Sequence, residues 1–523
     1  MAHKHLFASS PKAQKPDTMN GAGGRAYAFG AQHALAQYAV TGTFHSTYYA
    51  NETDQLKKVL ELCEQVPTSF IAKTALYTRE KGFMKDMPAF LAAYLAAKDV
   101  RALAPVFSRV IDSGKMLRNF VQIVRSGVTG RKSLGSAPKR LVQQWFAQRS
   151  PENVFRQSLG NDPSLADVIK LARPAPGDDA ARRALYGWLI GKEVEKSALP
   201  PLVQAFEAYK AGDSAILPDV PFEMLTALPL SSAAWKQLAK NMSWTQLRMN
   251  LNTLARHDVL ADAAMVKWVA STLADEANVR RSRVFPYQLM AAFKAANESV
   301  PKPIHLALQQ AMEIAIENVP KVEGKVYVCP DVSGSMHSPV TGHRAGGTTA
   351  VRCIDVAALV GAAFLRKNPH AEIIPFSDDV VPLGKALNPL DSVMTNAERL
   401  SSLPSGGTSC SAPLRHLNAR GAKGDLVVYV SDNMSWVDFA NGHSSGRGGT
   451  KMAEEWARFS GKNPKAKLVL VDIQPYGSTQ VRDDPAVLNV GGFSDRVFEI
   501  VSLFSEGKLG AGHWVQEIEA VQV

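Results

Sequence analysis

The chain has 523 residues, of which 46% are hydrophobic, and its net charge is +11. This length allows two or more domains with full hydrophobic cores. The four cysteines show no CxxC motif and no close pairing, which argues against a disulfide framework or a zinc site. No apolar run approaches the ~18 residues of a membrane span, and the first residues lack the apolar segment of a secretion signal. We therefore expect a cytoplasmic protein without a membrane partner.

The excess positive charge lies in the N-terminal part. Residues 1–320 contain 39 Lys and Arg against 27 Asp and Glu, a net charge of +12, whereas residues 321–523 have 20 against 21, or −1. Residues 113–150 contain eight bases and no acid. A solvated helical face normally carries both signs, so this run favours phosphate binding over the alternative of a merely soluble basic surface.

The predicted elements divide the chain at about residue 320. Residues 1–24 are polar and rich in Gly, Pro and Ser, which predicts a flexible N-terminal arm. From residue 25 to 320, apolar residues recur at intervals of three and four between short breaks, so we predict helices almost throughout. Clear examples are 54–65, 87–97, 138–148, 180–189, 261–276 and 304–318. Many short paired helices favour a solenoid or a closed ring of helical repeats.

Residues 321–523 change to buried strands that alternate with helices. Continuous runs of Val, Ile and Leu predict the strands, and amphipathic or apolar segments between them predict the helices. The strands are expected at 325–331, 371–378, 425–432 and 467–475, and the helices at 348–365, 451–459 and 495–504. This alternation is typical of an α/β domain with a doubly wound parallel sheet.

Polar residues follow the first predicted strand in a pattern that suits a cation. Asp331, Ser333 and Ser335 share a tight turn at the carboxyl end of that strand, where open parallel sheets bind ligands. Thr408 in a GGT turn and Asp432 at the end of another strand supply further oxygens. Such oxygens suit Mg²⁺, with Mn²⁺ or Ca²⁺ as alternatives. The competing interpretation is that these residues only cap turns and helices.

The same region gives little support for catalysis. His337, His343 and His416 are the nearest histidines in the sequence, but no carboxylate is spaced to orient any of them, so we interpret them as surface residues. The GGTT segment at 346–349 could hold a phosphate at a helix N-terminus, although it lacks the lysine of a P-loop. We predict no catalytic residue and no enzyme; a metal-dependent nuclease is the alternative, and such sites usually contain more acid.

The metal pattern resembles the metal-ion-dependent adhesion site of von Willebrand factor A domains at all five positions. In that family one coordination position stays open for a partner's acidic side chain. Together with LGSAPKRLVQQWF (134–146), WTQLRMNLNTLA (244–255) and RVFPYQLMAAF (283–293), the pattern resembles the Ro autoantigen (TROVE-domain) family, including its bacterial orthologues. The resemblance covers nearly the whole chain.

This resemblance implies an α-helical ring of HEAT-like repeats at 25–320, closed by a von Willebrand factor A domain at 321–523. It implies that the ring binds the single-stranded 3′ ends of misfolded or immature RNAs in its central hole. The outer basic surface would bind Y RNA, a small structured non-coding RNA. We accordingly expect a monomer that acts in RNA quality control, maturation or decay, with polynucleotide phosphorylase or another ribonuclease as a partner.

The resemblance also places basic and polar residues at RNA-binding positions. Arg173 is a departure, because vertebrate members have a histidine there. Arg248 and Asn250 match polar residues that line the ring, and capping and bridging between stacked helices is the alternative for both. The predicted RNA-binding residues are Arg131, Lys132, Lys139, Arg140, Arg156, Lys170, Arg173, Arg248 and Asn250.

Two further points stay open at this stage. Tyr48, Tyr49, Trp145 and Trp244 are candidates for stacking on bases, with burial in the core as the alternative. A different function is a docking scaffold, in which the metal site captures an acidic protein partner and the basic region is incidental. Substitution of Asp331 would then abolish the main interaction, and charge reversal among the bases would leave it intact.

Overall fold

The computed structural model describes residues 14–41, 44–282, 284, 286–319, 321–343, 351–440, 449–492, 495–510 and 512–523. The chain divides into two compact units. Unit 1 comprises Met1–Val59, Trp244–Asn252 and Asp262–Gln516, and unit 2 comprises Leu60–Ser243, Thr253–Ala261 and Glu517–Val523. These units do not follow the predicted boundary at residue 320, because the helices just before it group with the sheet that follows.

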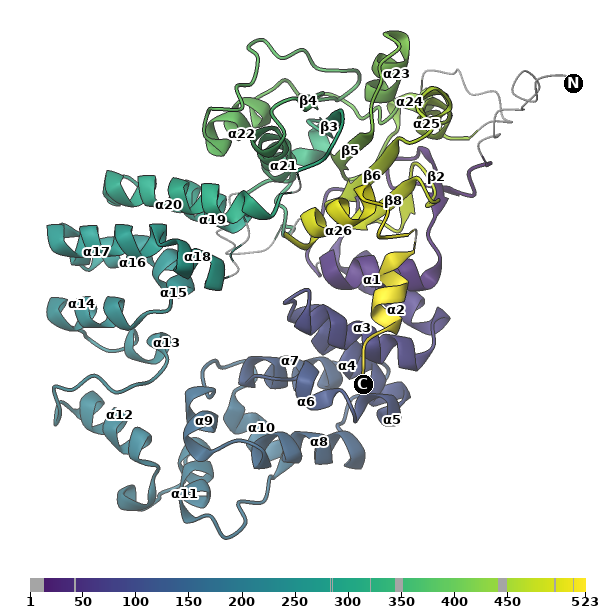
Figure 1. The fold of residues 1–523 in the computed structure, drawn as a ribbon. Helices are drawn as coiled ribbons and strands as arrows, with labels where there is room; N and C mark the ends of the chain where they lie inside the picture. The colour runs from purple at the N-terminus through teal and green to yellow at the C-terminus, as the bar shows by residue number, and fades with distance from the viewer. Residues whose placement is uncertain are drawn as a thin grey trace, which may run out of the picture. The chain divides into compact units, whose positions relative to one another are not determined.

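A five-stranded parallel sheet forms the centre of unit 1 (Figure 1). Its strand order is β4-β3-β5-β6-β8, and every neighbouring pair is parallel. The order reverses between β3 and β5, which is the place where open α/β sheets bind ligands. The strands are β3 (Val326–Pro330), β4 (Glu372–Ile373), β5 (Leu426–Ser431), β6 (Lys467–Asp472) and β8 (Val487–Gly491).

Helices cover both faces of this sheet. On one face, α21 (Cys353–Lys367) and α26 (Asp495–Ser505) contact each other through Phe364 and Phe498. On the other face, alternate residues of β3, β5 and β6 pack beneath α23 and α25, whose bounds are Ala412–Ala419 and Lys451–Lys462. Because both faces are buried, the strands are almost continuously apolar. The predicted doubly wound α/β fold is confirmed.

A small antiparallel sheet attaches the N-terminal residues to unit 1. Strand β1 (Thr18–Met19) pairs with β2 (Arg25–Ala28), and β2 pairs with β7 (Ser478–Thr479). Asn20, between β1 and β2, is only 6% exposed. The prediction of a flexible arm is therefore wrong for residues 18–24, since backbone pairing and burial hold them in place. Two-residue strands carry too short a pattern to be seen in the sequence.

The remaining elements of unit 1 are mostly helices. They are α1 (Ala31–Thr41), α15 (Trp244–Met249), α17 (Ala263–Ala274), α18 (Glu276–Ser282), α19 (Pro286–Ala295), α20 (Lys302–Ala315), the 3-10 helices η4 (Ile316–Asn318) and η5 (Gly334–His337), α22 (Val393–Ser401) and α24 (Val437–Ala440). Three helices contain residues of both units: α2 (Glu52–Gln65), α16 (Leu251–Arg256) and α27 (His513–Glu519).

Unit 2 is helical throughout its described length. Its elements are α3 (Thr68–Glu80), α4 (Asp86–Lys98), α5 (Val100–Leu103), α6 (Phe107–Val110), α7 (Gly114–Arg125), α8 (Ser136–Ala147), α9 (Pro151–Arg156), α10 (Leu165–Ala172), α11 (Ala180–Leu189), α12 (Pro201–Ala211), α13 (Phe222–Leu225), α14 (Ser232–Asn241), η2 (Lys196–Ala198) and η3 (Val259–Ala261). The predicted helical region before the sheet is confirmed. A closed ring concerns how the units are arranged and stays a prediction.

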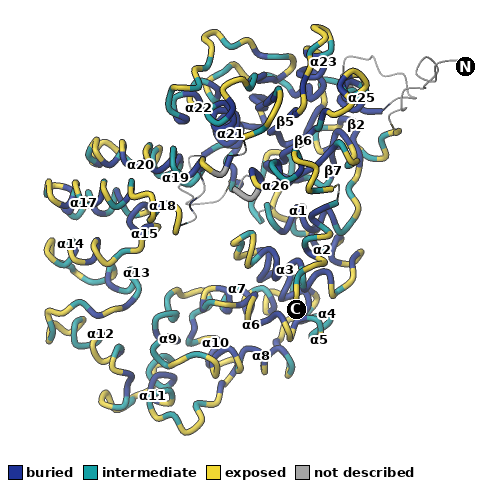
Figure 2. Tube along the Cα trace, in the orientation of Figure 1, coloured by how far each residue is buried: buried dark blue, intermediate teal, exposed yellow. Residues whose placement is uncertain are grey.

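The packing of unit 2 explains where its charges lie. Helix α4 is buried from Met87 to Ala96, because it is apolar on all sides. Helix α7 is amphipathic and buries one face, so the bases at Lys115 and Arg125 stay exposed. Figure 2 shows how buried and exposed positions alternate along these helices. Among the described helices, none has both the length and the apolar character needed to cross a bilayer. The four cysteines are buried free thiols.

Candidate metal centre and nucleic-acid interface

Asp331 and Asp432 lie at the point where the strand order reverses. Asp331 directly follows β3 and Asp432 directly follows β5, its neighbour in the sheet. Both are buried, at 0% and 1% exposure. Asp331 Oδ1 accepts the Ser333 backbone N–H at 2.8 Å, and Oδ2 accepts the Ser431 hydroxyl at 2.6 Å. Ser431 is a site residue that the sequence analysis missed, although its place at the last position of a strand, before Asp432, was a usable signal.

The hydroxyl groups of the site come from two turns that are bonded to each other. Ser333 Oγ and Ser335 Oγ lie 3.4 Å apart, and both residues are buried. Between them, the Gly334 N–H donates to the Gly406 carbonyl at 2.9 Å. This bond joins the DxSxS turn to the GGT turn.

Thr408 connects the GGT turn to the loop after β5. It is 1% exposed, and its carbonyl accepts backbone N–H groups of residues 436 and 437, each at 3.1 Å. The structure therefore brings the turns that carry all five predicted ligands to one edge of the sheet. Metal binding itself stays a prediction.

The electrostatics of this edge favour a cation. Burial raises the pKa of Asp331 to about 7, and the Asp432 carboxylate raises it too. Asp472, at the end of β6, is a third buried carboxyl whose pKa is raised by burial and by Asp432. The Asn433 amide and the Gln474 backbone are near enough to lower the pKa of Asp472 again, but in the described part of the chain neither Asp472 oxygen, nor the Asn433 amide nitrogen, has a hydrogen bond of normal geometry. None of the described ion pairs involves these three carboxyls, so their charge is uncompensated.

The donor set fits a hard cation and little else. Two carboxylates with three hydroxyls are typical oxygen ligands of Mg²⁺ or Ca²⁺. Within the described ranges, no group of three or more His, Cys, Asp and Glu side chains could hold a metal ion. His337, His343 and His416 are exposed, and the prediction that they are surface residues is confirmed. The segment 346–349 lies outside the described residues.

Tyr49 lies near the predicted metal ligands, a position that the sequence analysis did not predict. Burial is the main effect that raises the pKa of its phenol; Asp432 raises it as well, and a hydrogen bond with Ser335 lowers it. Its ring meets that of Tyr476 edge-on at 5.6 Å. Tyr49 therefore lies against the predicted metal ligands, whereas its neighbour Tyr48 is 57% exposed and keeps the surface needed to stack on a base.

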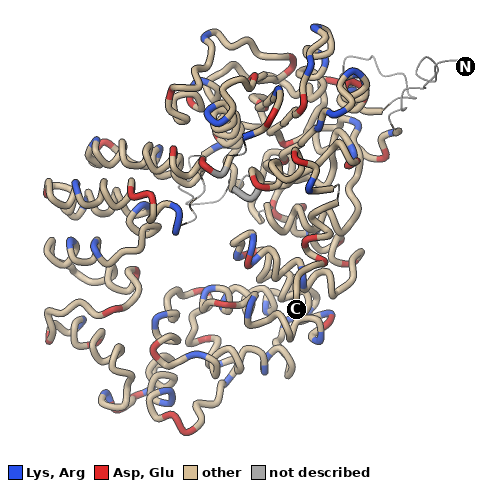
Figure 3. The backbone as a smooth tube through the Cα atoms, in the orientation of Figure 1, with Lys and Arg blue, Asp and Glu red and all other residues tan. Residues whose placement is uncertain are grey.

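In unit 2, bases lie on the two neighbouring helices α8 and α10 (Figure 3); Lys139 is half-buried, and the others are exposed. Gln143 of α8 donates from Nε2 to the Ala172 carbonyl at the end of α10, at 2.8 Å. The bases one turn before Gln143 therefore lie beside those in the last turn of α10 and at its cap. The four form no ion pair in the described structure, which leaves them available to phosphate. We call this group the basic surface: Lys139, Arg140, Lys170 and Arg173.

Comparisons with known proteins agree with both parts of the chain. The family model of the Ro60 vWA domain matches residues 325–505, and that of the TROVE domain matches residues 188–326. A relative from Deinococcus radiodurans, named RNA-binding protein RO60, is 24% identical over 94% of this chain and 95% of its own length. The chain belongs to the Ro family.

Two further similarities support this membership. A Caenorhabditis elegans protein of the same name is 23% identical over 53% of this Ro-family chain and 43% of that protein. The crystal structure of the Deinococcus radiodurans Ro protein superposes with a TM-score of 0.63, covering 92% of this chain and all of that one at 21% identity. That structural likeness concerns the fold alone. The family resemblance predicted from the sequence is confirmed.

The other predicted RNA-binding residues of this Ro-family chain differ in whether their side chains already have partners within the protein. Lys132 is exposed. Arg156 forms an ion pair with Asp219 at 2.7 Å, which a phosphate would have to replace. Arg131 donates from NH1 to the Ala96 carbonyl at 2.8 Å, a bond that ties the loop before α8 to the end of α4.

Arg131→Ala should therefore act on stability. We expect the free energy of unfolding to fall by about 1–3 kcal/mol, because a partly buried carbonyl loses a charged donor. Urea denaturation followed by circular dichroism measures this loss. Arg125→Ala is the matched control, since Arg125 is exposed in the last turn of α7. Equal stability of the two variants would contradict the structural role of Arg131.

Arg248 and Asn250, which were predicted to line the ring, make contacts that fit their alternative role of capping and bridging helices. Arg248 is 8% exposed and donates from NH1 to the Gln288 carbonyl at 2.6 Å, and burial lowers the pKa of its guanidinium. Asn250 donates to the Gln246 carbonyl at 2.8 Å. Arg248 thus bridges helices of this Ro-family chain, and Asn250 bonds within its own turn.

The tryptophans considered for base stacking are buried. Trp145 is 1% exposed and donates from Nε1 to the Ile111 carbonyl at 2.8 Å, while Trp244 is 9% exposed and donates to the Leu273 carbonyl at 3.3 Å. Both belong to the core, which was the alternative interpretation.

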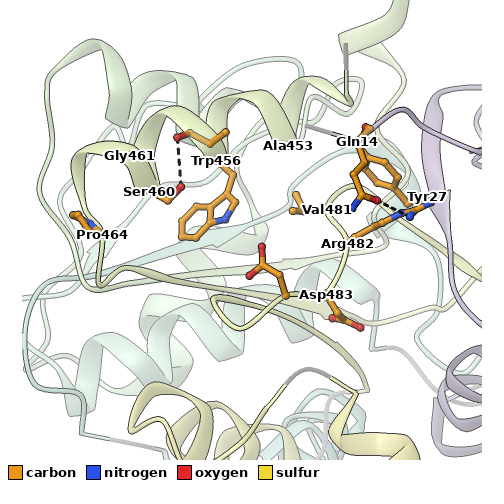
Figure 4. Close-up of a pocket in the computed structure, with 12 residues that line it drawn as sticks. Gln14, Tyr27, Ala453, Trp456, Ser460, Gly461, Pro464, Val481, Arg482 and Asp483 are labelled. Carbon is orange, nitrogen blue, oxygen red and sulfur yellow. Dashed lines mark hydrogen bonds between the residues drawn. The ribbon is translucent and has the colours of Figure 1, made fainter. Parts of the chain in front are cut away.

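A cavity of 480 Å³ lies elsewhere in unit 1, between α25 and the loop at 481–484 (Figure 4). Trp456 and Tyr27 form part of its wall. Its arginine, Arg482, is held by Gln14 and by an ion pair with Asp17. The cavity contains none of the residues predicted for metal or RNA in this Ro-family chain.

Proposed function

We propose that this chain is an RNA-binding protein that acts in RNA quality control, maturation or decay. The observation that carries the proposal is the similarity, over 94% of the chain, to a relative named as an RNA-binding protein. The basic surface supplies the required chemistry, because its four bases are unpaired and lie on neighbouring helices. Bases free of internal partners release counterions when they bind phosphate, and that release dominates affinity for nucleic acids.

The RNA classes we propose are single-stranded 3′ ends of misfolded or immature RNAs and a small structured RNA of the Y type. Recognition of such ligands relies on backbone charge and stacking more than on base sequence. The basic surface and the exposed ring of Tyr48 offer both kinds of contact. An exoribonuclease such as polynucleotide phosphorylase is the proposed protein partner. The chain itself is proposed to be monomeric and without catalytic activity.

We also propose that unit 1 holds one divalent cation, Mg²⁺ before Mn²⁺ or Ca²⁺. Its ligands would be the carboxylates of Asp331 and Asp432 and the hydroxyls of Ser333, Ser335 and Thr408. When bound, the cation supplies positive charge that compensates the buried carboxylates. The uncompensated charge at the carboxyl edge of the sheet supports this proposal.

A comparison of matched RNAs tests the RNA proposal. One stem-loop is prepared with a single-stranded 3′ tail, with the same tail at its 5′ end, and with a blunt end. We expect the 3′-tailed form to bind at least about tenfold more tightly than the blunt form, the effect of one or two stacked bases, and its affinity to fall steeply with salt. Fluorescence anisotropy measures both. Equal affinity for all three RNAs would contradict the proposed recognition of 3′ ends.

A further inference from the structure

Two N-terminal segments of unit 1 cover the loops that carry the predicted metal ligands. The first is the turn between β1 and β2. Asn20 donates from Nδ2 to the Ser435 carbonyl at 2.8 Å, three residues after Asp432. A Cβ atom at Gly24 would lie 1.9 Å from that same carbonyl oxygen, so only glycine allows this approach. The turn is therefore fitted closely to the loop after β5.

The second segment comprises residues 44–50. The His343 N–H, in the loop after the DxSxS turn, donates to the Ser46 carbonyl at 2.7 Å. The Thr47 N–H then donates to the Ala50 carbonyl at 2.8 Å and closes a tight turn around the two tyrosines. Both backbone bonds fix where Tyr49 can lie.

Tyr49 is also held from the sides. A Cβ atom at Gly21, in the first segment, would lie 3.1 Å from Tyr49 Cβ, and the Tyr476 ring meets the Tyr49 ring at 5.6 Å. The Tyr49 phenol is near enough to Ser335 and to the carboxyls of Asp432 and Asp331 for all three groups to act on its pKa. The phenol is thus positioned at the predicted ligands by contacts on three sides.

We infer that Tyr49 closes the metal site from within the chain. Its hydroxyl would take the coordination position that adhesion-type sites leave open to an acidic partner. The bound cation therefore fastens residues 44–50 to the sheet, and it does not serve as a docking point for another protein. A neutral phenol contributes an oxygen without adding negative charge, which suits a site that already contains two carboxylates and lies near a third. This inference rests on the proposed cation.

The test compares Tyr49→Phe with Tyr48→Phe in the full chain. Each variant keeps its aromatic ring and loses only a hydroxyl, and Tyr48 is the exposed neighbour. Binding of Mn²⁺, measured by electron paramagnetic resonance, and of Mg²⁺, measured by calorimetry, gives the affinities. Hydrogen exchange with and without Mg²⁺ reports on residues 44–50. We expect Tyr49→Phe to weaken cation binding about tenfold, as loss of a group next to a metal typically does, and to remove Mg²⁺-dependent protection of this segment.

Three outcomes would overturn the inference. The first is unchanged affinity and protection in Tyr49→Phe. The second is faster exchange of residues 44–50 when Mg²⁺ is added to the unaltered protein, because the segment would then be displaced as partner docking requires. The third is the absence of cation binding in the unaltered protein, which would also remove the proposed metal site. None of these assays contains RNA, so they leave the RNA proposal to its own experiment.

Discussion

Replacing Lys139, Arg140, Lys170 and Arg173 together by alanine is expected to weaken RNA binding by about two orders of magnitude near physiological salt. Each base that contacts a phosphate releases a counterion, so the slope of log affinity against log salt should fall by about 3 in magnitude. The fold should persist, because these side chains form no ion pair in the described structure. Titrations at several salt concentrations, with thermal unfolding beside them, measure both properties.

The control for this variant removes the same charge elsewhere in unit 2. Exposed lysines that do not belong to the basic surface serve this purpose: Lys192, Lys196, Lys210 and Lys240. We expect their combined replacement by alanine to change affinity by less than about threefold, since only long-range attraction is reduced. If both quadruple variants lose affinity equally, binding depends on net charge alone and the basic surface has no special role.

The strands that the sequence predicted well are those buried on both faces. β3, β5 and β6 appear as continuous apolar runs because helices cover both sides of them. β8 was missed: its segment VLNVG is interrupted by Asn489, whose side chain is buried and bonded to Thr479 and Asp483. The N-terminal sheet was missed because β1 and β2 are short and because β2 pairs with β7 across more than 400 residues, as Ala28 with Ser478 shows. Local periodicity contains no information about such a pairing.

For the predicted metal and RNA sites as well, the local sequence could place some residues and could not place others. Asp331 and Asp432 could be placed together because the carboxyl ends of neighbouring parallel strands meet at one edge. Tyr49 could not be placed there, since nothing in its local sequence indicates a contact with Ser335. Arg131 is part of the same basic run as the free bases, yet its guanidinium is bonded to a backbone carbonyl. Charge counts identify the part of the chain where phosphate binding is expected, but packing decides which of its bases remain free.

Asp331→Asn is expected to raise the stability of the metal-free protein at pH 8 and to abolish its stabilisation by Mg²⁺. In EDTA, the carboxylate is buried beside Asp432 without a compensating charge, and an isosteric amide should relieve about 1–4 kcal/mol of that penalty. The amide can be accommodated: its oxygen can still accept the Ser333 N–H, and its nitrogen can donate to the Ser431 hydroxyl. The Mg²⁺ effect should reverse the order of the two proteins. At about one thousand times Kd, the unaltered protein gains roughly 4.1 kcal/mol, whereas the variant gains nothing.

The raised pKa of Asp331 also determines how the stability of the metal-free protein changes with pH. The folded-state pKa of Asp331 is raised to about 7, above the ~3.9 of an unfolded aspartate. Between these values the folded protein binds a proton that the unfolded chain releases, so the free energy of unfolding falls as pH rises from about 4 to 7. In EDTA the unaltered protein should therefore be more stable at pH 5 than at pH 8, and the variant should show a smaller decline, because Asp432 still titrates.

Denaturation of both proteins at pH 5 and pH 8, in EDTA and in Mg²⁺, separates a metal site from a set of turn caps. If the five residues only capped turns, Asp331→Asn would replace two charge-assisted hydrogen bonds by weaker neutral ones and would be the less stable protein in EDTA at pH 8. Asp178→Asn removes an exposed carboxyl from a loop of unit 2 and controls for the change in net charge. In a metal site, the Asp331 carboxylate lowers stability without the cation and raises it with the cation, so Mg²⁺ reverses which of the two proteins is more stable. A residue that only caps a turn would not respond to Mg²⁺ in this way.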